Sequence, residues 1–177
     1  KHSPFPEEMN RQITSRIADY HFAPTQRSYE NLLKENIQKE TISITGNTVI
    51  DALLDSTQRV KTYQNDEIEF LKTIMDDSKK LLLVTGHRRE NHGEGFINIC
   101  NALKEIAVSN NDVQIVYPVH LNPNVQKPVN EILSNIDNIS LIKPLGYPAF
   151  VWLMSQSYLI ITDSGGVQEE APSLGKP

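Results

Sequence analysis

The clearest structural signal lies near the end of the chain, in the run Tyr158-Leu159-Ile160-Ile161-Thr162-Asp163-Ser164-Gly165-Gly166. Residues 158–162 are apolar at consecutive positions and partly β-branched, which is typical of a parallel strand buried on both faces. The glycines that follow predict a turn into a helix that begins at Gly166. The run therefore predicts a strand–turn–helix unit of an α/β fold.

The same alternation of strand and helix extends back over most of the chain. We expect further strands at 42–44, 81–85, 113–117 and 139–142, and helices at 95–108, 124–133 and 149–154. Strands that alternate with helices predict βαβ units and a Rossmann-like, doubly wound parallel sheet. Because the pattern before Thr41 is richer in helix, we place a domain boundary there, with residues 1–40 as a helix–strand–helix segment and 41–177 as the α/β domain.

Composition limits the classes of function. The chain has 177 residues, of which 38% are hydrophobic, and a net charge of −5. This charge argues against a nucleic-acid partner, which would need a basic surface, but it allows a phosphorylated ligand, because such sites need only local positive charge and aimed N–H groups.

The one cysteine, Cys100, excludes an internal disulfide and favours a buried thiol and a cytoplasmic location. The apolar runs are too short to span a membrane, and no histidine has the spacing of a metal ligand.

In open parallel sheets, ligands bind at the carboxyl ends of the strands, so the loops there are the first candidates for a site. Asp163-Ser164-Gly165-Gly166 combines two glycines, the Ser164 hydroxyl and the free N–H groups of a helix start, which together can cradle a phosphate or diphosphate. Glu170, about one turn further on, could accept hydrogen bonds from ribose hydroxyls. An ordinary helix cap explains the same spacing about equally well.

Three other polar segments carry weaker signals. Gly86-His87-Arg88-Arg89-Glu90 follows the strand at 81–85, where a histidine and arginines could meet an anionic ligand, although a solvated charged loop is the simpler interpretation. His120 follows the strand at 113–117 and could be structural. Glu7 and Glu8 could be acids that a helix dipole favours in the first turn.

Taken together, five runs resemble the non-hydrolysing UDP-N-acetylglucosamine 2-epimerases, and the resemblance covers essentially the whole chain. The runs are Ser3-Pro4-Phe5-Pro6-Glu7-Glu8-Met9-Asn10-Arg11, Gly46-Asn47-Thr48-Val49-Ile50-Asp51-Ala52, Val84-Thr85-Gly86-His87-Arg88-Arg89-Glu90, Tyr117-Pro118-Val119-His120-Leu121-Asn122-Pro123 and Thr162-Asp163-Ser164-Gly165-Gly166-Val167-Gln168-Glu169-Glu170-Ala171-Pro172. The resemblance implies one half of a GT-B-type two-domain fold. Residues 1–40 would end the N-terminal domain, and residues 41–177 would form most of the nucleotide-binding C-terminal domain.

The resemblance also implies a reaction. The family interconverts UDP-N-acetylglucosamine and UDP-N-acetylmannosamine: UDP leaves C1 as a C2 proton is removed, which gives a 2-acetamidoglucal, and UDP then re-adds with protonation on the opposite face. No cofactor is implied. The parent enzyme would be a cytoplasmic homodimer that binds UDP-N-acetylglucosamine and UDP and serves cell-envelope polysaccharide biosynthesis.

The family's functional residues carry over to matching positions of this sequence. The implied catalytic residues are Glu7 and His87. The implied substrate-binding residues are Ser164, Gly165 and Gly166 at the diphosphate, Glu170 at the ribose, and Leu145 and Phe150 at the uracil, with Leu145 using its backbone. Arg88 and His120 fall where bacterial members bind a second, activating UDP-N-acetylglucosamine.

The chain also departs from the family pattern by omission. It lacks the family's Gly-Thr-Arg-Pro-Glu, His-Gly-Asp, Glu-Ala-Gly and Thr-Glu-Arg-Pro-Glu segments, some of which carry other catalytic acids. We therefore expect a piece of a longer enzyme that is inactive alone. The alternatives are a hydrolysing epimerase or GT-B glycosyltransferase with the same nucleotide site, a non-catalytic nucleotide-sugar-binding module, and a Rossmann-like domain without a ligand.

Overall fold

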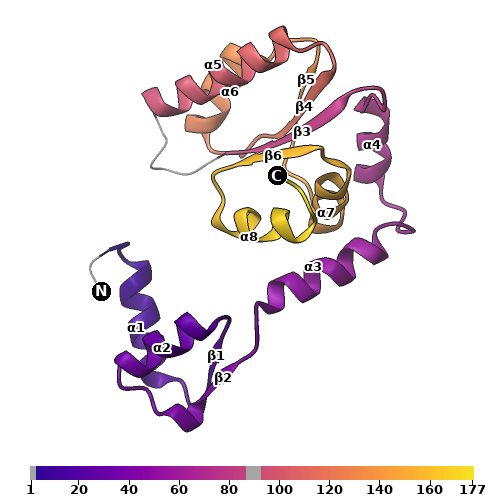
Figure 1. Ribbon diagram of the computed structural model, residues 1–177. Coiled ribbons are helices and arrows are strands. Elements are labelled where there is room, and N and C mark those ends of the chain that lie inside the picture. Colours follow the sequence, from indigo (N-terminus) through magenta and orange to yellow (C-terminus); the bar gives the residue numbers. More distant parts are fainter. Residues whose placement is uncertain (1–2, 87–92) are drawn as a thin grey trace. The chain divides into compact units, whose positions relative to one another are not determined.

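A computed structural model describes residues 3–86 and 93–177 (Figure 1). The chain divides into two compact units, Lys1–Asp51 and Ala52–Pro177. The predicted site residues His87 and Arg88 lie outside the described residues.

The first unit is a small parallel strand pair with helices. It contains α1 (Glu7–Ile17), β1 (His21–Ala23), α2 (Gln26–Lys34), a short 3-10 helix (Lys39–Thr41) and β2 (Ile42–Ile44). The two strands pair in parallel, with His21 opposite Ile42 and Ala23 opposite Ile44. The helix α2 begins where expected, because the Thr25 hydroxyl accepts a hydrogen bond from the Ser28 N–H at 3.1 Å. Neither α1 nor α2 contains a buried residue.

The pairing of β2 with β1 places β2 in the first unit. Sequence composition placed a boundary at residues 40/41, but β2 hydrogen-bonds to β1 and therefore belongs to the first unit. The compact units divide after Asp51, within α3 (Thr48–Arg59). The assignment of residues 1–40 and 41–177 to two domains of a larger fold stays a prediction.

The second unit contains the predicted parallel sheet. Its strands are β3 (Lys80–Thr85), β4 (Val113–Pro118), β5 (Ile139–Ile142) and β6 (Leu159–Thr162), in the order β5-β4-β3-β6, and all neighbours are parallel. Its helices are most of α3 and the helices α4 (Asp66–Ile74), α5 (Glu94–Ser109), α6 (Pro123–Leu133), α7 (Tyr147–Gln156) and α8 (Gly165–Ser173). The predicted alternation of strands and helices is therefore confirmed.

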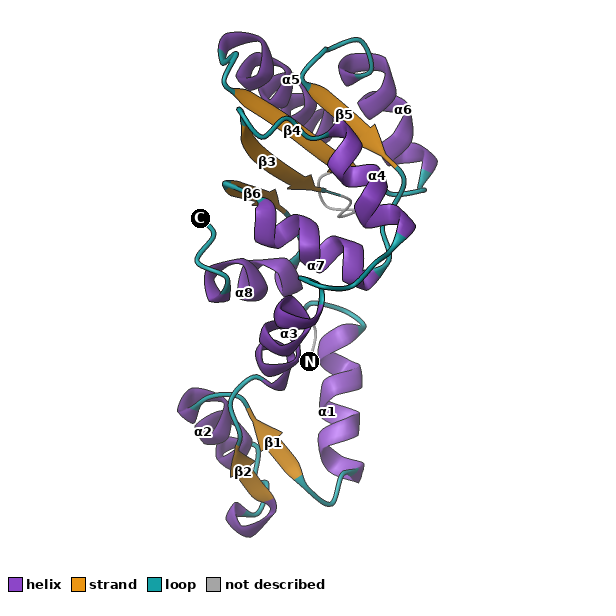
Figure 2. Ribbon diagram, turned by 90° about the vertical axis from the view of Figure 1, so that its right-hand side faces the viewer, coloured by secondary structure: helices purple, strands orange, loops and turns teal. Residues whose placement is uncertain are grey.

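Helices cover both faces of this sheet, as in a doubly wound fold (Figures 1 and 2). Leu82 and Val84 of β3 point into a core formed with α5 and α6, whereas Leu81 and Leu83 point into a core formed with α4, α7 and α8. This alternation follows from the two-residue period of a strand. Cys100 lies in the first of these cores with no exposed surface, so the predicted buried thiol is confirmed.

Helix boundaries differ from the predicted ones by a few residues. The helix expected at 149–154 is α7, which begins earlier at Tyr147 because Pro148 is compatible with the first turn of a helix. The last helix begins at Gly165, one residue before the predicted start. None of the described helices is both long and apolar enough to cross a membrane.

Candidate functional site

Loops that follow four parallel strands meet at the carboxyl edge of the sheet and surround a hollow of about 240 Å³. Four of the predicted site residues, from three different loops and the helix α7, line it together: His120, Leu145, Phe150 and Ser164. The remaining lining residues are Thr85, Gly86, Pro118, Pro144 and Val167. The hollow thus lies where ligands bind in open parallel sheets.

A wider surface depression, of about 650 Å³, lies near the opposite edge of the sheet. It is lined by Lys79, Lys104, Val108, Asn111, Glu131, Ile132 and residues 135–138. These residues belong to connections that precede β3, β4 and β5 and to neighbouring helix ends. Because ligands of open parallel sheets bind at the carboxyl edge, we favour the smaller hollow as the site.

The turn before α8 has the open geometry of an anion cradle. Ser164 is the N-cap residue, yet no side-chain hydrogen bond caps the helix among the described residues. A Cβ atom at Gly166 would meet no described atom closer than Ser164 Oγ, at 3.9 Å. The first N–H groups of α8 therefore remain available to an anionic ligand. This arrangement favours the cradle over the ordinary helix cap that the sequence left as an alternative.

Two threonine hydroxyls fix the turn to the neighbouring strand. Thr85 and Thr162 are opposite each other at the ends of β3 and β6, and their Oγ1 atoms lie 2.5 Å apart. Thr162 Oγ1 also accepts a hydrogen bond from the Ser164 N–H at 3.0 Å, and the Asp163 N–H donates to the Thr85 carbonyl at 3.2 Å. Sequence reasoning missed both threonines, because their role depends on the pairing of β3 with β6.

A buried tyrosine anchors the start of the loop that follows β3. The Tyr117 side chain is 1% exposed, and its hydroxyl donates to the Gly86 carbonyl at 2.8 Å. Burial raises the pKa of Tyr117, so the hydroxyl keeps its proton and remains a donor. Tyr117 therefore fixes the residue that directly precedes His87.

The two remaining polar candidates in this unit have distinct surroundings. Glu170 is half-buried on α8, and burial followed by the nearby charge of Glu169 raises its pKa; it does not line the hollow. The Nδ1 atom of His120 accepts a hydrogen bond from the Asn122 N–H at 3.1 Å. A neutral His120 ring therefore carries its proton on Nε2.

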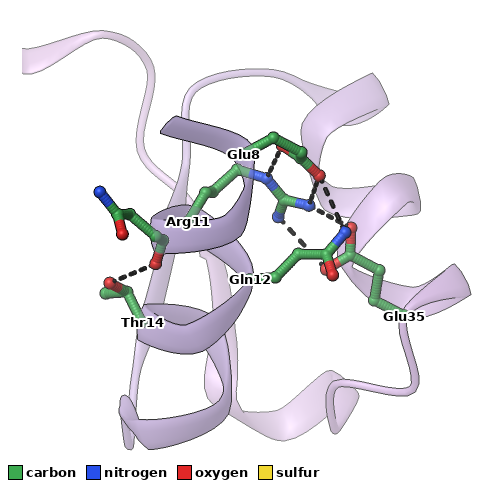
Figure 3. A network of polar contacts seen from close by, with 6 residues as sticks. Glu8, Arg11, Gln12, Thr14 and Glu35 are labelled. Atoms are coloured by element: carbon green, nitrogen blue, oxygen red, sulfur yellow. Dashed lines mark hydrogen bonds and ion pairs between the residues drawn. The ribbon is translucent and has the colours of Figure 1, made fainter. Parts of the chain in front are cut away.

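The predicted acid Glu7 belongs to the first unit, where it is the exposed first residue of α1. Among the described residues its side chain has no hydrogen bond or ion pair. Its neighbour Glu8 differs, because Arg11 binds both Glu8, at 2.7 Å, and Glu35, at 2.6 Å (Figure 3). Hydrogen bonds from Arg11 and Gln12 lower the pKa of Glu8 to about 2. Glu8 is therefore held as a carboxylate, whereas Glu7 is left unpaired by the described part of the chain.

The parallel sheet and its two layers of helices define a Rossmann-like half of a GT-B-type fold, with the candidate site in the hollow at the carboxyl edge of the sheet. A family model described as UDP-N-acetylglucosamine 2-epimerase matches residues 1–177. The chain belongs to the UDP-N-acetylglucosamine 2-epimerase family.

Individual relatives agree with this assignment. The chain is 61% identical to a UDP-N-acetylglucosamine 2-epimerase of Campylobacter jejuni and 58% identical to one of Salmonella typhimurium, and each match covers 99% of this chain and 47% of the relative. Among solved structures, the UDP-GlcNAc 2-epimerase of Neisseria meningitidis bound to UDP-GlcNAc is 49% identical with a TM-score of 0.90, covering 99% of this chain and 48% of that one. The chain thus spans about half the length of the relatives it matches.

A second similar solved structure is a complex with UDP. The S. aureus MnaA protein with UDP is 42% identical to this chain, with a TM-score of 0.87. The match covers all of this chain, at 100%, and 47% of the S. aureus chain.

Proposed function

We propose that this chain is part of a non-hydrolysing UDP-N-acetylglucosamine 2-epimerase, which interconverts UDP-N-acetylglucosamine and UDP-N-acetylmannosamine. One observation carries the proposal: Leu145, Phe150 and Ser164, which come from separate segments, line the same hollow at the carboxyl edge of the sheet. Solved relatives were obtained with UDP-GlcNAc or UDP, which is the ligand chemistry that this hollow would accept.

In this proposal, the turn before α8 holds the diphosphate. Ser164, Gly165 and Gly166 bring the N–H groups and the positive end of the α8 dipole toward it. Glu170 accepts hydrogen bonds from the ribose, Phe150 forms a wall of the base pocket, and the Leu145 backbone contacts the base. The raised pKa of Glu170 fits a carboxyl group that loses solvent on a partly covered surface.

The proposed reaction needs a stabilised leaving group, because UDP departs from C1 while a proton leaves C2. Preorganised N–H donors of α8 stabilise the negative charge that develops on the diphosphate. The diphosphate stays bound, so UDP can add again after the glycal is protonated on its other face. The hollow therefore keeps the leaving group, UDP, bound. If UDP dissociated, the free sugar would be released.

In this proposal, two further residues carry the proton transfer at C2. Glu7 is the proposed acid–base residue on α1, and His87 is the proposed active-site histidine beside the diphosphate. Glu8 is unsuited to donate a proton near neutrality, because its pKa of about 2 keeps it ionised. The unpaired state of Glu7 within the described residues supports choosing Glu7 over its neighbour.

Further parts of the proposal concern regulation and assembly. Arg88 and His120 form part of a second site for an activating UDP-N-acetylglucosamine. The full-length enzyme acts in the cytoplasm as a homodimer, without a cofactor, and its product feeds cell-envelope polysaccharides.

Isotope exchange tests the proposed reaction. Full-length enzyme incubated with UDP-N-acetylglucosamine in heavy water should yield both UDP-sugars with deuterium at C2, as measured by mass spectrometry and NMR. Free N-acetylmannosamine and UDP would instead indicate a hydrolysing epimerase, and sugar transfer to an acceptor would indicate a glycosyltransferase. UDP binding without turnover would indicate a non-catalytic module, and the absence of UDP binding by calorimetry would leave a Rossmann-like domain without this ligand.

A further inference from the structure

A carboxylate from a distant helix holds the loop that contains Leu145. The Gly146 N–H donates to both carboxylate oxygens of Glu67, at 3.2 and 3.1 Å, although the two residues are 79 positions apart in sequence. Gly146 is the N-cap residue of α7 and has no capping side chain of its own. Glu67 thus joins the start of α4 to the start of α7.

The Glu67 side chain is well placed for this contact because α4 is itself fixed. Asn65 caps α4 and accepts hydrogen bonds from the N–H groups of Glu67, at 2.8 Å, and Ile68, at 3.3 Å. Ile68 and Leu71 are 1% and 0% exposed, so the next turn of α4 is firmly packed in the core. The carboxylate therefore extends from a rigid helix start.

The glycine at position 146 leaves room for the carboxylate. Its φ of −65° and ψ of 157° are available to any residue, so backbone conformation gives no reason for glycine here. A Cβ atom at this position would lie 3.0 Å from Glu67 Oε2. The absence of a side chain is therefore what permits the close approach of Glu67.

Both polar groups of the Gly146 backbone are engaged, whereas those of Leu145 have no hydrogen bond within the part of the chain that the structure describes. The Gly146 carbonyl accepts a hydrogen bond from the Phe150 N–H at 3.0 Å, while its N–H is held by Glu67. Within residues 3–86 and 93–177, no hydrogen bond reaches the N–H or carbonyl of Leu145. Leu145 also lines the hollow at the carboxyl edge of the sheet. One backbone donor and one backbone acceptor thus remain beside the hollow.

A donor and an acceptor on one residue complement the edge of uracil, which presents the O4 acceptor next to the N3–H donor. Cytosine presents the reverse pattern, with an N4 donor next to an N3 acceptor. A fixed Leu145 backbone would therefore favour uracil, whereas a loop free to rotate would lose this preference. The Glu67 contact restrains the peptide unit that joins Leu145 to Gly146, which contains the Leu145 carbonyl.

We propose that Glu67 is a positioning residue for base recognition, which sets the preference for uracil by holding the Leu145–Gly146 peptide in place. This proposal rests on the proposed function, because it assumes that a uridine nucleotide occupies the hollow. Glu67 acts through the loop and need not touch the ligand.

Calorimetric titration of the full-length enzyme with UDP and with CDP tests the proposal, because the two share ribose and diphosphate and differ only in the base. We expect wild type to prefer UDP, and Glu67→Ala to reduce the ratio of the two affinities by roughly tenfold, in line with the loss of one charge-assisted hydrogen bond. Glu67→Gln, whose amide oxygen can still accept from Gly146, should retain most of the preference. An unchanged ratio in Glu67→Ala would overturn the proposal, whether or not overall affinity falls.

Two further variants separate positioning from general stability. Glu69→Ala removes another carboxylate of α4, which among the described residues pairs only with Lys72 on the surface, and this variant should leave the ratio unchanged. Gly146→Ala crowds the carboxylate and should lower the ratio as Glu67→Ala does. A lower melting temperature in Glu67→Ala with the wild-type ratio would show that Glu67 only caps α7. If wild type binds neither nucleotide, the proposed function itself fails.

Discussion

At the level of single residues, Gly166 allows ligand binding to be separated from folding. Among the described residues, a Cβ atom there would make only an ordinary contact with Ser164 Oγ, at 3.9 Å, and glycine is a poor helix former. We predict that Gly166→Ala stabilises the protein by up to about 0.5–1 kcal/mol, while it weakens UDP binding by roughly tenfold because the methyl group occupies the diphosphate position. Denaturant unfolding and calorimetry measure the two effects.

Gly95 provides the matched control for this substitution. It holds the same second position in α5 as Gly166 does in α8, and a Cβ atom there would meet no described atom within 4 Å. Gly95→Ala should therefore change stability in the same direction and leave UDP affinity unchanged. Full UDP affinity in a folded Gly166→Ala variant would contradict the cradle.

A second residue-level prediction concerns Tyr117. Removing its hydroxyl leaves the Gly86 carbonyl without the donor it has at 2.8 Å. We predict that Tyr117→Phe lowers the free energy of unfolding by about 1 kcal/mol, measured by urea denaturation. Tyr63→Phe should have no effect, because the Tyr63 side chain is 51% exposed. Equal stability of wild type and Tyr117→Phe would show that the hydroxyl does not hold the loop.

Residue types in the sequence indicated part of the candidate site, but not the residues that hold its loops in place. The glycines and hydroxyl of Ser164-Gly165-Gly166 carry their chemistry in the sequence, so their placement at a strand end could be predicted. Thr85 and Thr162 are ordinary strand residues until β3 and β6 are known to pair. In the sequence, Glu67 looks like an ordinary acid of the first turn of a helix. No pattern near either residue indicates its contact with Gly146, because the two are 79 positions apart.

At the level of secondary-structure elements, the ion pairs of Arg11 connect α1 to Glu35 at the end of α2 (Figure 3). The pKa of Glu8 is lowered from 4.5 to about 2 in the folded protein. Because the pKa of Glu8 is lower in the folded than in the unfolded protein, ionised Glu8 stabilises the fold at any pH above its unfolded pKa. This stabilisation is lost as the pH falls toward the pKa of the folded protein. The contribution of Glu8 should therefore be complete above about pH 5 and decrease below it.

The variant Glu8→Gln tests this pH dependence. We expect wild type to be the more stable protein at pH 7, and the difference in melting temperature to shrink steadily from about pH 4.5 downward, measured by circular dichroism. The effect should be small, because both side chains are partly exposed to solvent. A difference that stays constant down to pH 3 would show that the ion pair does not form in solution.

Element type was easier to predict than element pairing. Consecutive apolar residues identified β3 to β6, because a buried parallel strand must be apolar on both faces. The pairing of β1 with β2 was not predicted, since each strand has only three residues and no distinctive pattern. For the same reason, composition could not show that Ile42–Ile44 belongs with the first unit.

At the level of the whole molecule, Cys100 reports on opening of the second unit. It has no exposed surface, and burial raises its pKa to about 11, so it should react with iodoacetamide only when the core opens. We predict that UDP at about 100 times its dissociation constant slows this reaction by roughly a hundredfold. Mass spectrometry of the Cys100 peptide measures the rate in the full-length enzyme. Equal rates with and without UDP would show that the second unit does not hold the nucleotide.

The strand order β5-β4-β3-β6 has a consequence for synthesis on the ribosome. The three strands β3, β4 and β5 can pair as soon as they emerge, but β6 is made after them and pairs with β3, the earliest of the four. Thr162 and Ser164 reach Thr85 only then. A nascent chain that stalls before Leu159 would therefore have a largely formed sheet with an unpaired edge, and the candidate site would stay incomplete until β6 and the turn after it are made.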